Sequence, residues 1–292
     1  MSNELPPLLD LSEFDESVNW CVYGDSGVGK TVFGGTLPNA VFLSTEPGTI
    51  SAKRQGSTAK VRQIKNWEQL RAAYAWLRKG DHGFDWVVMD SATSMQHLAL
   101  RSILDTAVKE NPARDLDIPA IQDHQKWQNM FKRFVNMFND LSVNVLWTAT
   151  TMRKEDEEGD DIILPDIQGK GYGMSQFFCA AMHTVTYLSV QTEGRGSDRT
   201  KFRRLLGETD PPYFAKDRYN VLIPYVDYLN TDKTIGADLY QRIMESGDGH
   251  PDETLNTSKP AARKAPAKKT AAKATSRRAA PASAEDPDPD EE

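Results

Sequence analysis

Apolar residues in the first 150 positions fall either in longer stretches at helical spacing or in short continuous runs. The longer stretches predict helices. Asn66, with Gln69 three residues later, is typical of a helix N-cap, and the helix that it opens is expected to stop at Gly80. Further helices are predicted over Ser94–Glu110 and Asp123–Leu141. The short runs predict buried strands, which we place at Asn19–Tyr23, Ala40–Leu43, Asp85–Met89 and Val143–Trp147.

Strands that alternate with helices favour a mostly parallel sheet with helices on both faces. After Thr151 the pattern changes to shorter β-rich pieces without long helical stretches between them. These pieces are expected at Ile162–Leu164, His183–Val190, Lys201–Leu206 and Val221–Ile223. The sequence therefore predicts an α/β fold with a β-rich C-terminal part.

The composition changes sharply near position 250. Residues 259–284 are almost entirely Ala, Lys, Arg, Pro, Ser and Thr, without an aromatic or large aliphatic side chain. Such a segment cannot bury enough surface to offset the entropy lost on ordering. We predict an N-terminal extension at 1–17, one core at 18–250 and a disordered Lys/Ala/Pro-rich tail with an acidic tip at 251–292.

Charge is distributed unevenly along the chain. Its 292 residues include 35 Lys+Arg and 42 Asp+Glu, which gives a formal net charge of −7. The segment from Pro251 onward holds eight basic and eight acidic residues, so residues 1–250 carry the whole net charge. An acidic core argues against nucleic-acid binding over the whole surface. The basic block of the tail either contacts nucleic acid locally or keeps the chain soluble.

Cysteine usage and hydropathy exclude two further classes of protein. Only Cys21 and Cys179 occur, without metal-ligand spacing, so neither a disulfide framework nor a zinc site is indicated. No segment approaches the roughly 20 apolar residues that span a bilayer, and residues 1–10 lack a basic segment followed by an apolar run. We therefore expect a cytoplasmic protein with no membrane partner.

A complete G-x-x-x-x-G-K-[ST] string directly follows the Asn19–Tyr23 run. It consists of Gly24, Asp25, Ser26, Gly27, Val28, Gly29, Lys30 and Thr31. Glycines let successive N–H groups point at a phosphate, and a helix that begins near Lys30 adds its positive end. In this pattern Lys30 reaches the β- and γ-phosphates and the Thr31 hydroxyl ligates Mg²⁺. The sequence therefore predicts a P-loop nucleotide site.

Two carboxylates follow other predicted strands and are candidates to complete this site. Asp90 ends the Asp85–Met89 run, where ligands bind in open α/β sheets, and is the expected partner of Thr31 at the metal. In many ATPases a Glu directly after this Asp polarises the attacking water, but this chain has Ser91 there. Glu46 would face the γ-phosphate instead if its strand neighbours the P-loop strand. The alternative is an exposed turn residue before Pro47.

Other P-loop classes fit the sequence less well. The chain has no N-K-x-D string for guanine recognition, and its loop lacks the additional early lysine of partition ATPases. A nucleoside kinase would need an Arg-rich lid, whereas Lys154–Asp161 carries six acidic residues in eight positions. ATP is therefore the nucleotide expected by elimination.

The order of P-loop, strand-end Glu and strand-end Asp-Ser resembles the RecA/RadA ATPase core over about residues 17–230. More narrowly, it is similar to the phage-encoded RecA-like proteins of the Sak-type single-strand annealing group. The resemblance implies that Gly24–Thr31 is the Walker A loop, Asp90 the Walker B aspartate and Glu46 the water-activating residue. It also implies a γ-phosphate sensor at the end of the fourth strand, which here would be Thr150 or Thr151.

The segment that contains Lys216, Asp217 and Arg218 is similar to the K-N-R motif of RadA-like proteins, with Asp in place of Asn. In that family the two cations reach across a subunit boundary to the neighbouring nucleotide. Cations inserted in this way stabilise charge on the transferring phosphoryl group and make hydrolysis depend on assembly. The resemblance thus implies catalytic roles for Lys216 and Arg218 and self-association into a ring or filament. Two solvated strand-end cations are the alternative.

The family's DNA-binding loops correspond to residues 152–173, which are mostly acidic in this chain. Arg153 and Lys170 are candidate phosphate contacts, and Tyr172 in the Gly-rich strip 168–173 is a candidate for stacking on a base. The strip is equally compatible with a plain flexible loop. The expected partners are single-stranded DNA and a single-strand-binding protein.

Three hypotheses of different classes follow. The first is an ATP- and Mg²⁺-dependent RecA-like ATPase that acts on single-stranded DNA in phage recombination or annealing, stimulated by DNA and by assembly. The second is an ATP-gated assembly or binding module without significant turnover. The third is a nucleotide or small-molecule kinase, which the acidic segment 154–161 disfavours.

Overall fold

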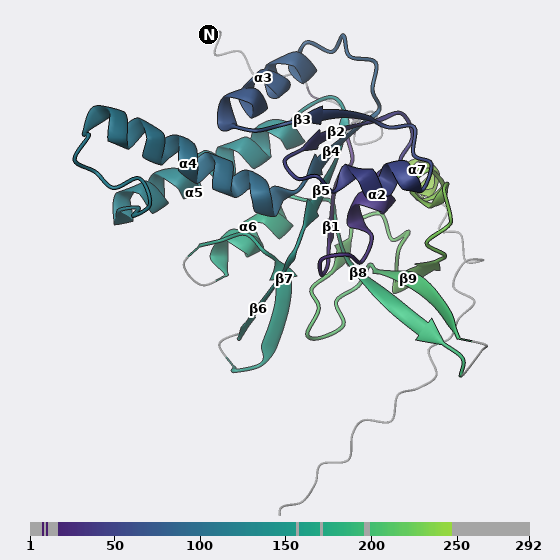
Figure 1. The fold of residues 1–292 in the computed structure, drawn as a ribbon. Helices are drawn as coiled ribbons and strands as arrows, with labels where there is room; N and C mark the ends of the chain where they lie inside the picture. Colours follow the sequence, from purple (N-terminus) through teal and green to yellow (C-terminus); the bar gives the residue numbers. More distant parts are fainter. Residues whose placement is uncertain are drawn as a thin grey trace, which may run out of the picture. The chain divides into compact units, whose positions relative to one another are not determined.

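The computed structural model describes residues 8, 10, 17–155, 158–169, 172–195 and 199–246. The predicted tail at 251–292 and nearly all of the predicted extension at 1–17 lie outside these residues. Helices and strands alternate in the first half of the chain, and strands dominate the second half (Figure 1). The helices are α1 (Lys30–Gly34), α2 (Thr49–Arg54), α3 (Trp67–Arg78), α4 (Ala92–Glu110), α5 (Ile121–Asn139), α6 (Gly173–Ala180) and α7 (Ile235–Ser246).

Most strands belong to one sheet, which has nine strands within the described residues and the order β11-β9-β8-β1-β5-β4-β2-β3, with β10 paired to β8. Its strands are β1 (Asn19–Tyr23), β2 (Ala40–Ser44), β3 (Lys60–Gln63), β4 (Trp86–Asp90), β5 (Asn144–Ala149), β8 (Thr184–Glu193), β9 (Thr200–Leu206), β10 (Lys216–Asp217) and β11 (Tyr225–Tyr228). Every pair from β3 to β8 is parallel. The pairs beyond β8 are antiparallel. The predicted α/β class with a mostly parallel sheet and a β-rich C-terminal part is therefore confirmed.

Alternate residues of the central strands pack on opposite faces of the sheet, as a strand covered on both sides requires. In β1, Cys21 and Tyr23 join the core formed with α3, α4, α5 and α6, whereas Trp20 and Val22 join the core formed with α1 and α7. All four side chains are fully buried. This double coverage leaves the strand ends and their loops as the places where polar chemistry can collect.

The capping prediction for the third helix is confirmed. Asn66 accepts a hydrogen bond from the backbone N–H of Gln69 at 2.9 Å, and α3 begins at Trp67. The prediction of a strand at Val221–Ile223 is wrong, because the last strand begins only at Tyr225. The N–H groups of Val221 and Leu222 donate to Asp217 Oδ2 at 2.8 and 2.9 Å instead of to a neighbouring strand. A buried carboxylate thus organises a loop where apolar character predicted a strand.

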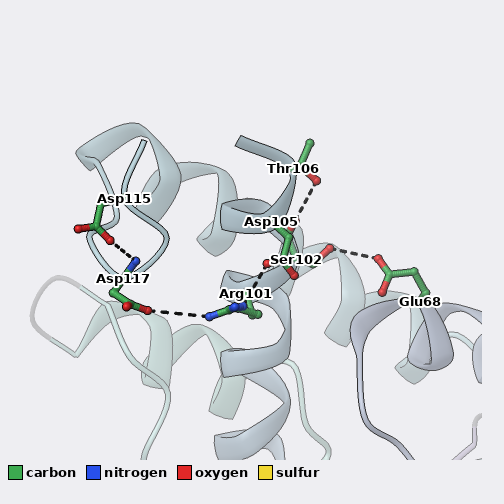
Figure 2. A network of polar contacts seen from close by, with 7 residues as sticks. All are labelled: Glu68, Arg101, Ser102, Asp105, Thr106, Asp115 and Asp117. Atoms are coloured by element: carbon green, nitrogen blue, oxygen red, sulfur yellow. Dashed lines mark hydrogen bonds and ion pairs between the residues drawn. The ribbon is translucent and has the colours of Figure 1, made fainter. Parts of the chain in front are cut away.

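The two longest helices, α4 and α5, pack side by side as a hairpin (Figure 1). A polar network fixes α4 to its surroundings (Figure 2). Arg101 contacts Asp105 one turn on at 3.1 Å and Asp117 of the connecting loop at 4.0 Å, while the Ser102 hydroxyl donates to Glu68 of α3 at 3.4 Å. These groups are largely exposed, so each contact adds little stability.

The loop between α4 and α5 also holds a buried ion pair and two exposed apolar side chains. Arg114 pairs with Asp123, whose carboxylate is fully buried, and this pairing lowers the pKa of that carboxyl. Asp123 also accepts from the N–H of Ala120 at 2.8 Å, which fixes the start of α5. By contrast, Ile118 and Ile121 are 68% and 91% exposed.

Strands β6 (Thr151–Glu155) and β7 (Asp161–Pro165) form a separate two-stranded antiparallel hairpin. Figure 1 shows them below the main sheet. Cys21 and Cys179 are free and buried, which confirms that they form no disulfide framework. None of the helices that the structure describes is both apolar enough and long enough to cross a membrane.

Candidate functional site

The phosphate loop, residues 24–31, joins the end of β1 to the start of α1. A Cβ at Gly24 would lie 2.3 Å from the carbonyl oxygen of Leu188 in β8, so no larger residue fits against that strand. Gly27 and Gly29 have φ values of 81° and 112°, a region that side chains rarely adopt. The sequence pattern and the backbone therefore agree on why these positions are glycines.

Lys30 lies over the loop that precedes it. Its Nζ donates to the carbonyl oxygens of Gly24 at 2.7 Å and Asp25 at 2.9 Å. Burial lowers the pKa of Lys30, and the nearby carboxylates of Asp90 and Glu46 oppose this shift. The ammonium thus stands beside two carboxylates from two other strands.

Thr31 and Asp90 meet as the pattern requires for a shared metal shell. The Thr31 hydroxyl lies 3.1 Å from Asp90 Oδ2, and the other carboxylate oxygen accepts from Thr148 of β5 at 2.7 Å. Burial raises the pKa of Asp90, while these two hydroxyl donors lower it. A hydroxyl and a carboxylate fit Mg²⁺, which keeps several waters and takes few protein oxygens beside the phosphates. Within the described residues no group of three or more His, Cys, Asp or Glu forms a separate metal site.

Glu46 reaches this end of the sheet by a different route from the one considered in the sequence analysis. Its strand β2 does not adjoin β1, because β5 and β4 lie between them. The β2–β4 pairing instead places Ser44 beside Asp90. Glu46 is exposed just beyond, and its Oε1 accepts from Ser91 Oγ at 2.8 Å and also from Ser94 Oγ. Ser91, which occupies the position of the missing glutamate, therefore holds Glu46 next to Asp90.

Of the two candidate sensor residues, only Thr151 contacts the phosphate loop. Its hydroxyl donates to Asp25 Oδ1 at 2.5 Å. The Thr150 hydroxyl lies 3.3 Å from that of Thr93 and 3.4 Å from Asp166 Oδ2. The structure therefore links Thr151, and not Thr150, to the loop.

Lys216 and Arg218 lie away from the phosphate loop of their own chain. Lys216 is level with Val185 of β8, which is itself level with Cys21 inside β1, whereas the loop follows the end of β1. Lys216 is half-buried and donates to the Ala180 carbonyl at 3.4 Å, and its pKa is lowered by burial and by Arg218. Arg218 is exposed. A role for either cation in phosphoryl transfer would need a second copy of the chain.

The three candidate DNA contacts differ in their surroundings. Arg153 is paired with Asp161 across the β6–β7 hairpin, with 2.7 Å from Nε to Oδ1, and this pairing raises its pKa. Tyr172 is partly buried against the core at the start of α6. Lys170 lies outside the described residues. The described part of this region thus shows one neutralised cation and one packed aromatic ring.

Several residues near the loop were missed by the sequence analysis. Thr148 and Ser94 are isolated hydroxyls whose partners, Asp90 and Glu46, come from other elements. Arg203 of β9 and Asn230 approach Gly29 from the antiparallel strands: a Cβ at Gly29 would lie 3.3 Å from Arg203 Nε and 3.5 Å from Asn230 Oδ1. None of these residues stands in a recognisable motif, so only the register of the sheet reveals them.

The family described as AAA domain matches residues 16–219, most of the core with the phosphate loop, Glu46, Asp90 and both cations. This chain belongs to the AAA domain family. The RecA-like P-loop ATPase core expected from the sequence is therefore confirmed at the level of the family and the fold. No curated protein matches this AAA domain.

Three solved structures are similar to the AAA domain at low sequence identity. The KaiC-like protein PH0186 from Pyrococcus horikoshii OT3 is 13% identical, over 66% of this chain and 80% of that one, with a TM-score of 0.36. Another ATPase domain of known structure is 11% identical, over 70% and 78%, with a TM-score of 0.40. The flagellar accessory protein FlaH from Methanocaldococcus jannaschii is 11% identical, over 73% and 85%, with a TM-score of 0.32.

Proposed function

We propose that this AAA domain hydrolyses ATP to ADP and phosphate with Mg²⁺ and acts on single-stranded DNA in phage recombination or annealing, as a Sak-type protein in the host cytoplasm. The observation that carries the hydrolytic part is the convergence of three strand ends. Thr31 contacts Asp90, and Ser91 next to Asp90 holds the Glu46 carboxylate. A metal shell and a general base thus lie side by side at the phosphate loop.

In this proposal the phosphate-loop N–H groups and Lys30 hold the β- and γ-phosphates. Thr31 and Asp90 hold the metal, which neutralises charge on the phosphoryl oxygens when bound. Glu46 accepts the proton of the attacking water at its exposed carboxylate, and Ser91 and Ser94 orient that carboxylate through Oε1. Thr151 senses the γ-phosphate through its contact with Asp25.

Assembly completes the site in this proposal. Lys216 and Arg218 of one copy reach the phosphates of the neighbouring copy in a ring or filament, which is supported by their position away from the loop of their own chain. DNA contact is local, through Arg153, Lys170, Tyr172 and the basic block of the tail. For Arg153 such contact requires exchange of its Asp161 partner for a phosphate.

The hydrolytic part is tested with Glu46→Gln, which keeps an oxygen acceptor for Ser91 and removes the base. We expect kcat to fall by about 100-fold with little change in ATP affinity. The matched control is Glu245→Gln, whose carboxylate contacts Gln241 on α7. It should hydrolyse ATP at the unsubstituted rate. An unchanged rate in Glu46→Gln would show that Glu46 is not the base.

The DNA part is tested by measuring the ATPase rate with and without single-stranded DNA at several salt concentrations. We expect stimulation that weakens as salt rises, because phosphate contacts release counterions. The same rate at every salt concentration, with no detectable binding of labelled DNA, would refute action on DNA and leave the ATPase intact. A tail deletion after Gly249 separates the basic block from the core contacts.

An ATP-gated module without significant turnover is the second candidate. It is favoured by one observation: Glu46 Oε1 already accepts from two hydroxyls, Ser91 and Ser94, which compete with water for that oxygen. Single-turnover measurements decide between the two. Cleavage of bound ATP that is no faster than in Glu46→Gln would favour the module.

A further inference from the structure

Two adjacent arginines of β9, Arg203 and Arg204, have opposite surroundings. Arg204 is fully partnered: its Nε lies 2.7 Å from Asp227 Oδ1, a second nitrogen lies 2.6 Å from Oδ2, and its guanidinium stacks 3.6 Å from the centre of the Tyr225 ring. Successive side chains of a strand point to opposite faces. Arg203 therefore cannot share this arrangement.

Arg203 lies beside the phosphate loop. It is level with Val190 of β8, two residues beyond Leu188, whose carbonyl touches the Gly24 position. Its Nε would be 3.3 Å from a Cβ at Gly29, the residue before Lys30. The guanidinium thus reaches the loop from the same chain, on the side of the sheet where Tyr228 packs against Phe33 of α1.

Arg203 has an unsatisfied donor at this position. Its Nε is buried and has no hydrogen-bond partner among the residues that the structure describes. A buried donor without an acceptor is costly, and more so on a charged group. An anion held by the loop would supply the acceptor, and guanidinium groups bind phosphate oxygens through two donors at once.

We propose that Arg203 binds the polyphosphate of the nucleotide held by its own chain's phosphate loop. This inference rests on the proposed function and deepens it, because it adds a cation in cis to Lys30 and to the cations expected from a neighbouring copy. The other explanation of the same geometry is mechanical: Arg203 fills space behind Gly29 and merely shapes the loop. The experiment separates the two.

Binding of Mg·ATP and of inorganic tripolyphosphate is measured by calorimetry for the unsubstituted full chain, Arg203→Met and Arg203→Lys. Arg203→Met should weaken both ligands by about tenfold or more, as the loss of a charge-assisted hydrogen bond implies. Arg203→Lys should recover part of the loss, and the salt dependence of binding should be weaker in Arg203→Met than in Arg203→Lys. In Arg203→Ala, added guanidinium ion should restore part of the affinity.

The matched control is Arg204→Met. It removes the contact with Asp227, so its melting temperature should fall while its affinity for both ligands is unchanged. Unchanged affinity in Arg203→Met overturns the inference. So does equal weakening in Arg203→Met and Arg203→Lys with unaltered salt dependence and no rescue, which would show a mechanical role. Failure of the unsubstituted chain to bind Mg·ATP would instead refute the proposed function itself.

Discussion

The parallel and antiparallel parts of the one sheet supply the site in different ways. In the parallel part, Lys30, Glu46 and Asp90 each follow or end a strand, and parallel strands bring those ends to one edge. In the antiparallel part, Arg203 reaches the loop only because β9 is level with a particular stretch of β8. Chemistry placed by strand ends is therefore visible in the sequence, and chemistry placed by register is not.

The largest expected effect tests whether the parallel part is indispensable. Lys30→Ala removes the ammonium that neutralises the phosphates, so we expect ATP hydrolysis to fall by at least about 1000-fold. The rate is measured by phosphate release at saturating ATP. Lys53→Ala, on the exposed face of α2, should be unaffected. Substantial residual activity in Lys30→Ala would mean that the loop is not the catalytic site.

The next effect concerns the antiparallel part and its stability. Asp217 accepts from Val221 N, Leu222 N, Tyr219 N and the Thr184 hydroxyl. Asp217→Ala leaves these donors unpaired and should lower the free energy of unfolding by about 2–4 kcal/mol in urea titrations. Asp227→Ala, which removes a partly exposed pair, should cost about 1 kcal/mol or less. Equal losses would remove the special status of Asp217.

A smaller effect should appear as a changed pH dependence. Burial raises the pKa of Asp90 and the Thr148 hydroxyl opposes that rise, so Thr148→Val should raise the pKa further. Because the ionised carboxylate is needed for Mg²⁺, the acid side of the ATPase profile should move to higher pH, by about one pH unit. Rates above that region should match the unsubstituted chain. A shift to lower pH would contradict the assignment.

The smallest effect distinguishes the two hydroxyls at the junction of β5 and β6. Thr151→Val removes the bond to Asp25 and should raise the KM for ATP by about threefold. Thr150→Val should leave the KM unchanged, because its contacts are with Thr93 and Asp166. The reverse pattern would assign sensing to Thr150.

Much of the parallel part could be predicted from the sequence. The apolar run Asn19–Tyr23 coincides with β1, and Asn66 caps α3 as its spacing with Gln69 indicated. These features depend on neighbouring residues alone: a buried strand needs continuous apolar character, and a cap needs a polar side chain three residues before its donor. The phosphate loop is equally local, because its glycines and lysine are consecutive.

The remaining features depend on which segments meet in space. Val221–Ile223 has the apolar character of a strand but is held as a loop by Asp217, four residues earlier. Glu46 was connected to the site through the wrong neighbour, because the order of the strands is not written in their sequences. Arg203 and Arg204 are identical residues side by side, and only their cross-strand partners tell them apart.

Helix α4 begins at the site through Ser91, its N-cap, which accepts from Ser94 N and donates to Glu46. The helix has 19 residues and is therefore about 28 Å long. Its far end carries the loop with the exposed Ile118. A stiff rod thus has one end fastened to the proposed base and the other at the surface. A partner that grips the loop pulls on the same hydroxyl that aims Glu46, so turnover and remote contact share one mechanical element.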